Sequence, residues 1–291
     1  MRIGAIFPQT EIGSDPLAIR DYAQAAEAMG YRHILAYDHV LGASTATRPN
    51  WRGPYTSDTS FHEPFVLFGY LAGLTRQVEL VTGIIILPQR QTVLVAKQAA
   101  EVDVLSGGRL RLGIGVGWNP VEFEGLNEDF HNRGARSVEQ VAVLRAVWTE
   151  PVVTFQGRWH HIDAAGINPL PVQRPIPIWF GGSPSEQILR RIARLGDGWM
   201  PQTPDPRKEE VRQIIERLRA LTSEAGRPPE AMGIEARLSI SMVSPDLWAT
   251  YAEGWRALGA THLGINTMGA GLTSPQAHID ALRQVKDVLA F

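Results

Sequence analysis

Short runs of apolar residues alternate along this chain with longer stretches in which apolar residues recur every three or four positions. The short runs are typical of β-strands, and the longer stretches are typical of amphipathic helices. Regular alternation of the two predicts parallel strands joined by crossover helices. We count eight such pairs, with strands predicted at residues 2–7, 32–37, 78–87, 110–115, 176–180, 198–201, 233–243 and 261–265.

Capping residues and glycines mark the predicted helix boundaries. A capping side chain followed by proline predicts a helix start, because proline at the first helical position loses no hydrogen bond. Gly30 and Gly107 follow helical stretches, as left-handed C-terminal caps do. The predicted starts lie at Asp15-Pro16, Ser183-Pro184, Ser244-Pro245 and Ser274-Pro275.

Eight strand–helix units in 291 residues predict a single α/β domain over residues 1–291, a (β/α)8 TIM barrel, rather than a doubly wound sheet. Three stretches are longer than ordinary connections, at 40–62, 117–136 and 151–175. The first two follow strands and therefore rise over the C-terminal, catalytic face. Segment 40–62 carries Trp51, Tyr55, Phe61 and His62 and suits a pocket lid, whereas 151–175 precedes a strand and predicts a small hairpin around Gly157.

Composition excludes several functional classes. The chain is 44% hydrophobic and 20% charged, with a net charge of -2 and no long basic run, so nucleic acid is not an expected partner. It has no cysteine, which excludes disulfides, thiolate nucleophiles and cysteine-bound metal. The N-terminus turns polar by Gln9, and no apolar run reaches membrane-spanning length, so we expect a cytoplasmic protein without a membrane partner.

The residues that follow the predicted strands form an inventory of the catalytic face. Asp38 is the one obvious carboxylate among them, whereas hydrolysis by metal or by paired acids needs several converging there. The histidines show no metal-ligand spacing, and we expect no metal site. A glycine-lined, apolar mouth instead suits a cofactor that carries the chemistry itself.

Asp38-His39 follows the second strand. An imidazole at a strand end, beside an acid that orients it, suits a proton donor or acceptor. The alternative is a histidine that only caps the loop. The location on the catalytic face favours the functional interpretation.

Gly181-Gly182-Ser183 follows the fifth strand and opens a helix. Free backbone N–H groups at the helix start would bind a phosphate. Alternatively, Ser183 with Glu186 would form a capping box that satisfies the same groups without a ligand. Arg133 and Arg136 pin their own loop by ion pairs or anchor an anionic cofactor tail.

Gly113-Ile114-Gly115-Val116-Gly117-Trp118 lacks the G-x-G-x-x-G spacing of a dinucleotide loop, and we reject that interpretation. Glycines at a strand end would make room for a flat ring system, with Trp118 as a wall. A β-bulge beside a core tryptophan explains the same spacing equally well.

Taken together and in order, these motifs resemble the luciferase-like flavin-dependent family over nearly the whole chain. The segments that carry the resemblance are Tyr37-Asp38-His39, Glu63-Pro64-Phe65, Thr82-Gly83-Ile84 with Pro88, Ala96-Lys97-Gln98-Ala99-Ala100, Leu105-Ser106-Gly107-Gly108-Arg109, Gly113 to Trp118, Arg133-Gly134, Gly181-Gly182-Ser183 and Gly196-Asp197-Gly198-Trp199-Met200.

The chain is most similar to the branch that uses coenzyme F420, an 8-hydroxy-5-deazaflavin. The resemblance implies that His39 lies near the reactive carbon of the ring and that the Gly83–Ile84 peptide bond is cis beneath it. It also implies a phosphate site at Gly181-Gly182-Ser183 and Gln202. The position of Trp118 holds an acidic proton donor in the sugar-phosphate dehydrogenase members, so this sequence departs from that pattern.

The predicted function is therefore an F420-dependent oxidoreductase that transfers a hydride between the ring and a small, uncharged or weakly polar organic substrate. His39 would handle the proton, and Asp38 would orient it. The expected cofactor contacts are Thr82, Gly83, Ile84, Val116, Gly117, Trp118, Gly181, Gly182, Ser183 and Gln202. Two alternatives remain, an FMN-dependent two-component monooxygenase and a non-catalytic flavin-binding member, and the resemblance also implies a homodimer.

Overall fold

The computed structural model describes residues 1–202 and 205–291. Its strands form a closed parallel barrel, in the order β3-β2-β1-β11-β10-β9-β8-β5, and the β3–β5 pairing closes the circle. The predicted TIM barrel is confirmed. The barrel strands are β1 (Arg2–Ile6), β2 (His33–Ala36), β3 (Glu79–Thr82), its short continuation β4 (Ile85–Ile86), β5 (Leu110–Gly115), β8 (Ile178–Gly182), β9 (Gly198–Pro201), β10 (Gly233–Ser239) and β11 (His262–Asn266).

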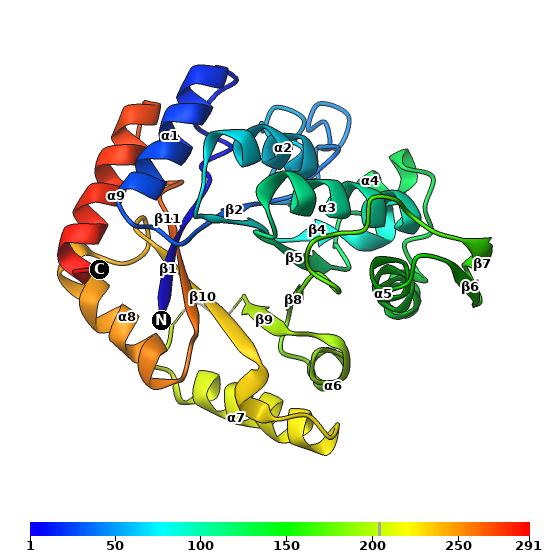
Figure 1. The fold of residues 1–291 in the computed structure, drawn as a ribbon. Coiled ribbons are helices and arrows are strands. Elements are labelled where there is room, and N and C mark those ends of the chain that lie inside the picture. The colour runs from blue at the N-terminus through cyan, green and yellow to red at the C-terminus, as the bar shows by residue number, and fades with distance from the viewer. Residues whose placement is uncertain (203–204) are drawn as a thin grey trace.

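Helices surround this barrel, and both chain ends lie on the same side of it (Figure 1). The predicted hairpin is present as β6 (Val153–Gln156) and β7 (His161–Ala165), and it projects away from the barrel. The helices are α1 (Pro16–Ala28), α2 (Pro64–Leu74), α3 (Thr92–Ser106), α4 (Pro120–Gly125), α5 (Arg133–Thr149), α6 (Glu186–Leu195), α7 (Glu209–Glu224), α8 (Trp248–Ala257) and α9 (Pro275–Leu289), with short 3-10 turns η1 (Leu87–Gln89), η2 (Pro229–Ala231) and η3 (Pro245–Leu247).

Two of the four expected helix caps form as predicted. Asp15 accepts a hydrogen bond from the backbone of α1, and Ser274 does the same for α9. Ser183 is not a cap, because α6 begins at Glu186 and its N-cap residue is Ser185, which makes no side-chain cap bond. Ser244 precedes the short turn η3 and also makes no cap bond.

Strand boundaries differ from the prediction in two places that matter for the site. The predicted strand 78–87 is interrupted at the Gly83–Ile84 peptide bond, which is cis as the resemblance implied. The predicted strand 233–243 ends at Ser239, because the chain then turns with backbone bonds from Met242 and Val243 back to Ser239. Both interruptions lie at the C-terminal edge of the barrel.

The lower interior of the barrel is charged rather than apolar. Glu235 on β10 is fully enclosed and accepts hydrogen bonds from Arg111 and from His33, the latter at 2.6 Å. Buried charges persist in proteins when they are paired in this way. Burial raises the pKa of the Glu235 carboxyl, but the charges of Arg111 and His33 outweigh that effect and hold it well below its usual range.

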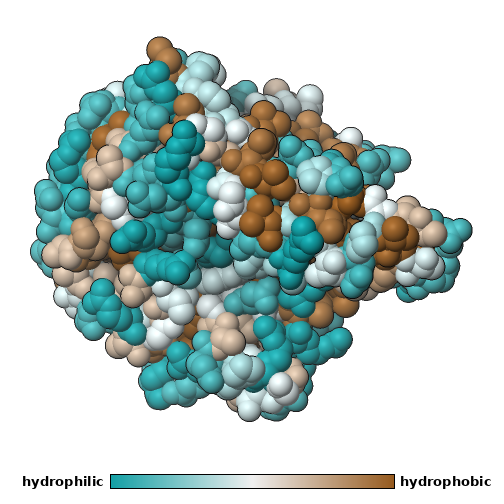
Figure 2. Space-filling model, in the orientation of Figure 1, coloured by the Kyte–Doolittle hydropathy of each residue, from teal (hydrophilic) through white to brown (hydrophobic). Residues whose placement is uncertain are grey.

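One face of the outer helical layer is unusually apolar. Figure 2 shows hydrophobic side chains gathered over α2 and α3. Val66 on α2 and Leu94 on α3 are 72% and 51% exposed. No helix among the described residues combines the length and the hydropathy that a bilayer crossing requires.

Candidate active site

A cleft of about 770 Å³ opens at the C-terminal ends of the barrel strands. This is the volume of a typical cofactor or substrate pocket, at the face where TIM barrels carry their chemistry. The predicted lid segment 40–62 contributes to its wall, as does the start of segment 117–136. Lining residues include Thr10, Tyr37, Asp38, His39, Tyr55, Phe61, Gly83, Ile84, Val116, Gly117, Trp118, Arg133, Ser137, Gly181, Gly182, Ser183, Arg191, Gln202, Arg237 and Met268.

Ile84 forms the floor of the cleft at the turn between β3 and β4. A Cβ atom added to Gly115 would lie 2.5 Å from the Ile84 side chain, and one added to Gly181 would lie 2.7 Å from it. The ends of β5 and β8 therefore need glycine so that Ile84 fits between them. The result is an apolar platform in the cleft, formed by the Ile84 side chain.

Thr82 lies outside the cleft, although the sequence predicted it as a cofactor contact. Its side chain is completely buried, its hydroxyl donates to the Gly113 carbonyl at 2.7 Å, and it does not line the cleft. Thr82 therefore supports the platform from below and does not contact a ligand in the cleft.

His39 is held by an acid that the sequence analysis missed. Its Nδ1 atom lies 3.3 and 3.4 Å from the two carboxylate oxygens of Glu122, which is on α4. The His39 ring also stacks on Tyr55, with the ring centres 3.8 Å apart. The imidazole is thus fixed on two sides, and its side chain remains 18% exposed toward the cleft.

Glu122 is a buried carboxylate with several donors. Its Oε1 atom accepts from the Val40 N–H at 2.8 Å, and its Oε2 atom accepts from the Tyr55 hydroxyl at 2.9 Å. Burial raises the pKa of Glu122, but the hydrogen bond and charge of His39 and the other donors outweigh that effect and lower it. Glu122 is therefore ionised near neutral pH and can accept from the His39 Nδ1–H group.

Asp38 does not orient His39, contrary to the prediction. Its carboxylate accepts from the Ile86 N–H at 2.9 Å and from Arg90 at 2.7 Å. Arg90 in turn pairs with Glu63 at 2.8 Å. Asp38 lines the cleft, and its bonds fix the strand that follows the Ile84 platform.

Aromatic rings form the wall next to His39. Trp118 packs against Trp51 and Tyr55, with ring centres 5.7 and 5.4 Å apart, and Phe61 contacts His39 at 4.8 Å. These rings come from the lid segment 40–62 and the end of β5. His62 lies outside the cleft, against the Gly13 carbonyl.

The opposite end of the cleft is cationic. Arg133 and Arg191 line it together with Ser137 and Ser183. The Nε atom of Arg133 is buried without a hydrogen-bond partner in the described chain. Burial lowers the pKa of Arg191, which nevertheless stays charged because an arginine titrates far above neutral pH.

The sequence left two alternatives at the start of α6, a phosphate site and a capping box, and the structure rejects the capping box. Ser183 and Glu186 form no capping box, because the Glu186 carboxylate binds Arg217 and Arg190, each at 2.6 Å. The start of α6 therefore keeps backbone N–H groups that can serve an anion. Arg136 pins its own loop through Glu128, and Arg133, which lines the cleft, also donates to the Phe130 carbonyl of that loop at 2.7 Å.

The structure brings nearly all predicted site residues to one cleft, Thr82 excepted. It adds Arg191 and Arg237 to the lining of the cleft and places Glu122 behind His39, and the sequence analysis singled out none of these three. A signal for Glu122 was present, since Asn119-Pro120 caps a short helix at the catalytic face and puts an acid in its first turn.

This chain has relatives among known proteins. The family model described as luciferase-like monooxygenase matches residues 3–287. An uncharacterized protein of Mycobacterium tuberculosis is 34% identical over 70% of this chain and 71% of its own length. The F420-dependent hydroxymycolic acid dehydrogenase of the same organism is 26% identical over 87% of this chain and 66% of its own.

Among solved structures, the monooxygenase RslO1 from Streptomyces bottropensis superimposes with a TM-score of 0.79. The superposition covers 100% of this chain and 99% of that one, at 20% sequence identity. At that identity, the likeness supports the barrel fold alone.

Proposed function

The chain belongs to the luciferase-like monooxygenase family, and from that premise we propose that it is an F420-dependent oxidoreductase. In this proposal it transfers a hydride between the deazaflavin ring and a small organic substrate. The similarity to an F420-dependent dehydrogenase supports the choice of cofactor. We also propose that the enzyme works in the cytoplasm, as expected from the sequence.

One observation carries the proposal, namely the order of chemical environments along a single cleft. A cationic end, with Arg133, Arg191 and the uncapped start of α6, suits a phosphate. The apolar platform at Ile84 suits a ring, and His39, fixed by Glu122 and Tyr55, lines the same cleft. The orphaned Nε atom of Arg133 fits a bound anion, because a buried donor without an acceptor is otherwise unfavourable.

When bound, the deazaflavin supplies the hydride acceptor or donor. The chain supplies the proton path. Since Glu122 accepts at the Nδ1 atom of His39, the Nε2 atom is left to exchange a proton with the substrate. In the direction of alcohol oxidation, the bound cofactor would take up the hydride of the alcohol carbon, and the Nε2 atom of His39 would accept the hydroxyl proton.

Glu122 then has a second task. As His39 takes up the proton it becomes an imidazolium, and the nearby carboxylate stabilises that charge. The aromatic wall formed by Trp51, Tyr55, Phe61 and Trp118 limits the entry of water beside the histidine. Fixed positions and the exclusion of water strengthen the interaction of Glu122 with His39 and that of His39 with the substrate.

An FMN-dependent monooxygenase is the second candidate, because the cationic end would hold the phosphate of either cofactor. The family includes monooxygenases by its own description. A non-catalytic flavin-binding member would use the same phosphate site but would have no use for the His39–Glu122 pair. The presence of the His39–Glu122 pair in this chain favours an enzyme.

Titration of the cofactor-free protein with F420 and with FMN, followed by fluorescence, tests the proposal. We expect clearly tighter binding of F420, and about tenfold or greater weakening in Arg191→Gln because a charged hydrogen bond to phosphate is lost. Arg190→Gln is the matched control, since Arg190 is adjacent in sequence but pairs with Glu186 on the surface. Tight binding of FMN without a response to F420 would replace this proposal with the monooxygenase.

A further inference from the structure

Arg237 lies at the mouth of the barrel, and none of the described residues forms an ion pair with it. Side chains alternate along β10, so that Ile234, Ala236 and Leu238 pack outward in the core and Glu235 and Arg237 face the barrel axis. Glu235 is already neutralised by Arg111 and His33 in the layer below. Within residues 1–202 and 205–291, the guanidinium of Arg237 forms no hydrogen bond and no ion pair.

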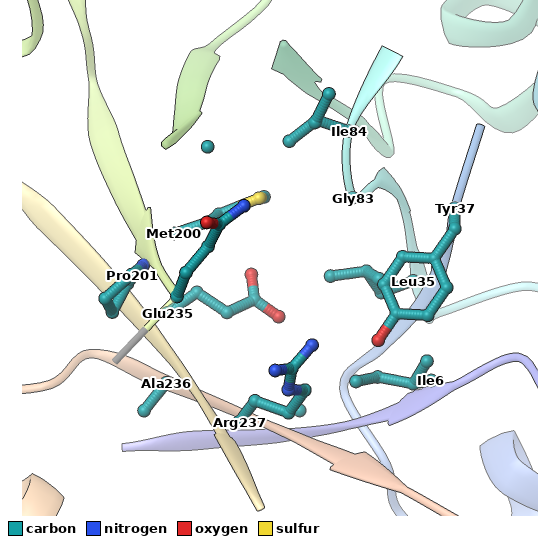
Figure 3. Close-up of a pocket in the computed structure, with 13 residues that line it drawn as sticks. Ile6, Leu35, Tyr37, Gly83, Ile84, Met200, Pro201, Glu235, Ala236 and Arg237 are labelled. Atoms are coloured by element: carbon teal, nitrogen blue, oxygen red, sulfur yellow. The ribbon is translucent and has the colours of Figure 1, made fainter. Parts of the chain in front are cut away.

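Arg237 is exposed to solvent, and a buried polar group without a partner faces the same space. The hydroxyl of Tyr37, at the end of β2, is buried and has no hydrogen-bond partner in the described chain. Tyr37, Arg237 and Gln202 each line both the main cleft and a smaller inner cavity of about 100 Å³. Figure 3 shows the Tyr37 hydroxyl and the Arg237 guanidinium directed into this inner pocket from opposite sides.

The strand order decides which ligand reaches these groups. In the closed barrel, β10 is four strands away from β3 in either direction, so Arg237 stands across the mouth from the Ile84 platform. A ring bound on Ile84 would have one face toward the platform, and its open side would then lie toward β10. A substrate would reach the ring from that side of the cleft, which Tyr37 and Arg237 line.

We propose that Arg237 and the Tyr37 hydroxyl form a recognition site for an anionic oxygen group of the substrate, and specifically for a carboxylate. This inference rests on the proposed function and narrows its substrate class to carboxylate-bearing molecules. It revises the uncharged or weakly polar substrate that the sequence led us to expect.

Chemistry favours a carboxylate over a neutral group at this position. A guanidinium presents paired donors that match the two oxygens of a carboxylate, and the phenolic hydroxyl adds a third donor. Part of the lining, formed by Ile6, Leu35 and Met200, is apolar, which strengthens a charged pair. The Glu235 carboxylate also lines this cavity, but it is paired with Arg111 and His33. The inner cavity, of about 100 Å³, has room for a small group such as a carboxylate.

Matched pairs of small probes test this site without knowledge of the natural substrate. Cofactor-loaded protein is titrated with acetate and acetamide, butyrate and butyramide, and benzoate and benzamide, and binding is followed by cofactor fluorescence. We expect at least one carboxylate to bind about tenfold or more tightly than its amide. In Arg237→Gln this preference should disappear, in Arg237→Lys part of it should remain, and Tyr37→Phe should reduce it.

The matched control is Arg256→Gln, which removes an exposed arginine of α8 that pairs with Glu253. It should leave every affinity unchanged. Arg237→Gln removes no internal bond of the described chain, so its thermal unfolding should match the wild type, and a misfolded variant is thereby recognised. If Arg237→Gln does unfold, Arg237→Lys carries the same comparison.

Three outcomes would overturn the inference. The first is the absence of any carboxylate preference in the wild type, and the second is a preference that survives Arg237→Gln. The third is a loss of cofactor affinity in Arg237→Gln as large as the loss of carboxylate affinity, which would assign Arg237 to the cofactor. If the protein takes FMN instead of F420, the proposed function fails, but the same titration on FMN-loaded protein still tests Arg237.

Discussion

Replacement of Glu122 by glutamine tests whether the carboxylate on α4 positions and charges His39. The change keeps the volume of the side chain but replaces one oxygen by an NH2 group and removes the negative charge. Oε1 accepts from Val40 and Leu41, at 2.8 and 3.3 Å, and Oε2 accepts from Tyr55. An amide can keep only one of these two acceptor positions.

The loss of stability in Glu122→Gln follows from the number of hydrogen bonds that the amide cannot keep. The amide oxygen will stay with the two backbone N–H groups, and the NH2 group will face Tyr55 and Gln89, both of which now donate to Glu122. The Tyr55 hydroxyl can rotate and accept instead, whereas the Gln89 amide loses its acceptor. At roughly 1–3 kcal/mol for a buried unsatisfied donor, we expect the free energy of unfolding to fall by about 2 kcal/mol.

Turnover should respond more strongly than stability. Without the carboxylate, His39 loses a charged hydrogen bond at Nδ1, which is worth roughly 1.5–3 kcal/mol, so kcat should fall about 10-fold to 100-fold. The dissociation constant of the cofactor should change by less than about threefold, because Glu122 does not line the cleft and the cationic end lies elsewhere.

Three measurements decide this prediction: urea unfolding, kcat at saturating substrate, and cofactor titration. Glu124→Gln is the matched control, since Glu124 lies on the same helix with an exposed side chain. A Glu122→Gln enzyme with unchanged kcat would refute the positioning role. A loss of cofactor binding equal to the loss of kcat would show instead that the variant has lost the shape of the cleft.

Four further predictions test other parts of the molecule. His39→Ala should lower turnover about 100-fold or more and leave cofactor binding nearly unchanged, as measured by steady-state kinetics and titration, and equal effects on both would contradict a proton role. Gly181→Val should weaken cofactor binding, because even a Cβ atom there lies 2.7 Å from Ile84, and unchanged titration curves would disprove the tight fit. Burial, with a further contribution from a nearby arginine, lowers the pKa of His262 from 6.5 to about 3. The unfolded chain therefore binds this proton first, so the stability present above pH 6.5 should be lost toward pH 3, and urea unfolding at several pH values should show a weaker loss in His262→Gln. The homodimer stays a prediction. If the apolar α2 face forms its interface, Val66→Asp should convert dimers to monomers, as measured by sedimentation.

The fold could be predicted because its signals are local. Strand and helix periods, proline after a cap, and glycine after a helix are each read within a few residues. The failed cap at Ser183 has a physical reason: the chain continues past β8 for three residues before it turns, so that Ser185 becomes the N-cap of α6. Local signals identify an element more reliably than its first residue.

The site could be predicted only where it follows a strand. Asp38 and His39 lie at a strand end, and the barrel edge brings such positions together. Glu122 lies in an insertion whose path is set by tertiary packing, so no periodicity connects it with His39. Arg237 lies inside a predicted strand, where its place on the axis-facing side depends on a register that the sequence alone leaves open.

Different elements of the barrel supply the residues proposed to bind the cofactor, to move the proton and to bind the substrate. The proposed phosphate end is built from α5 and α6, the proposed proton path from the end of β2 and from α4, and the proposed substrate contact from β10, across the barrel from β3. Residues without shared partners generally contribute independently to binding and catalysis. Substitution of Arg237 should therefore alter substrate choice while the cofactor and the proton chemistry at His39 stay the same. Among the described residues, we expect β10 to be the element through which the substrate range of this enzyme can be redirected.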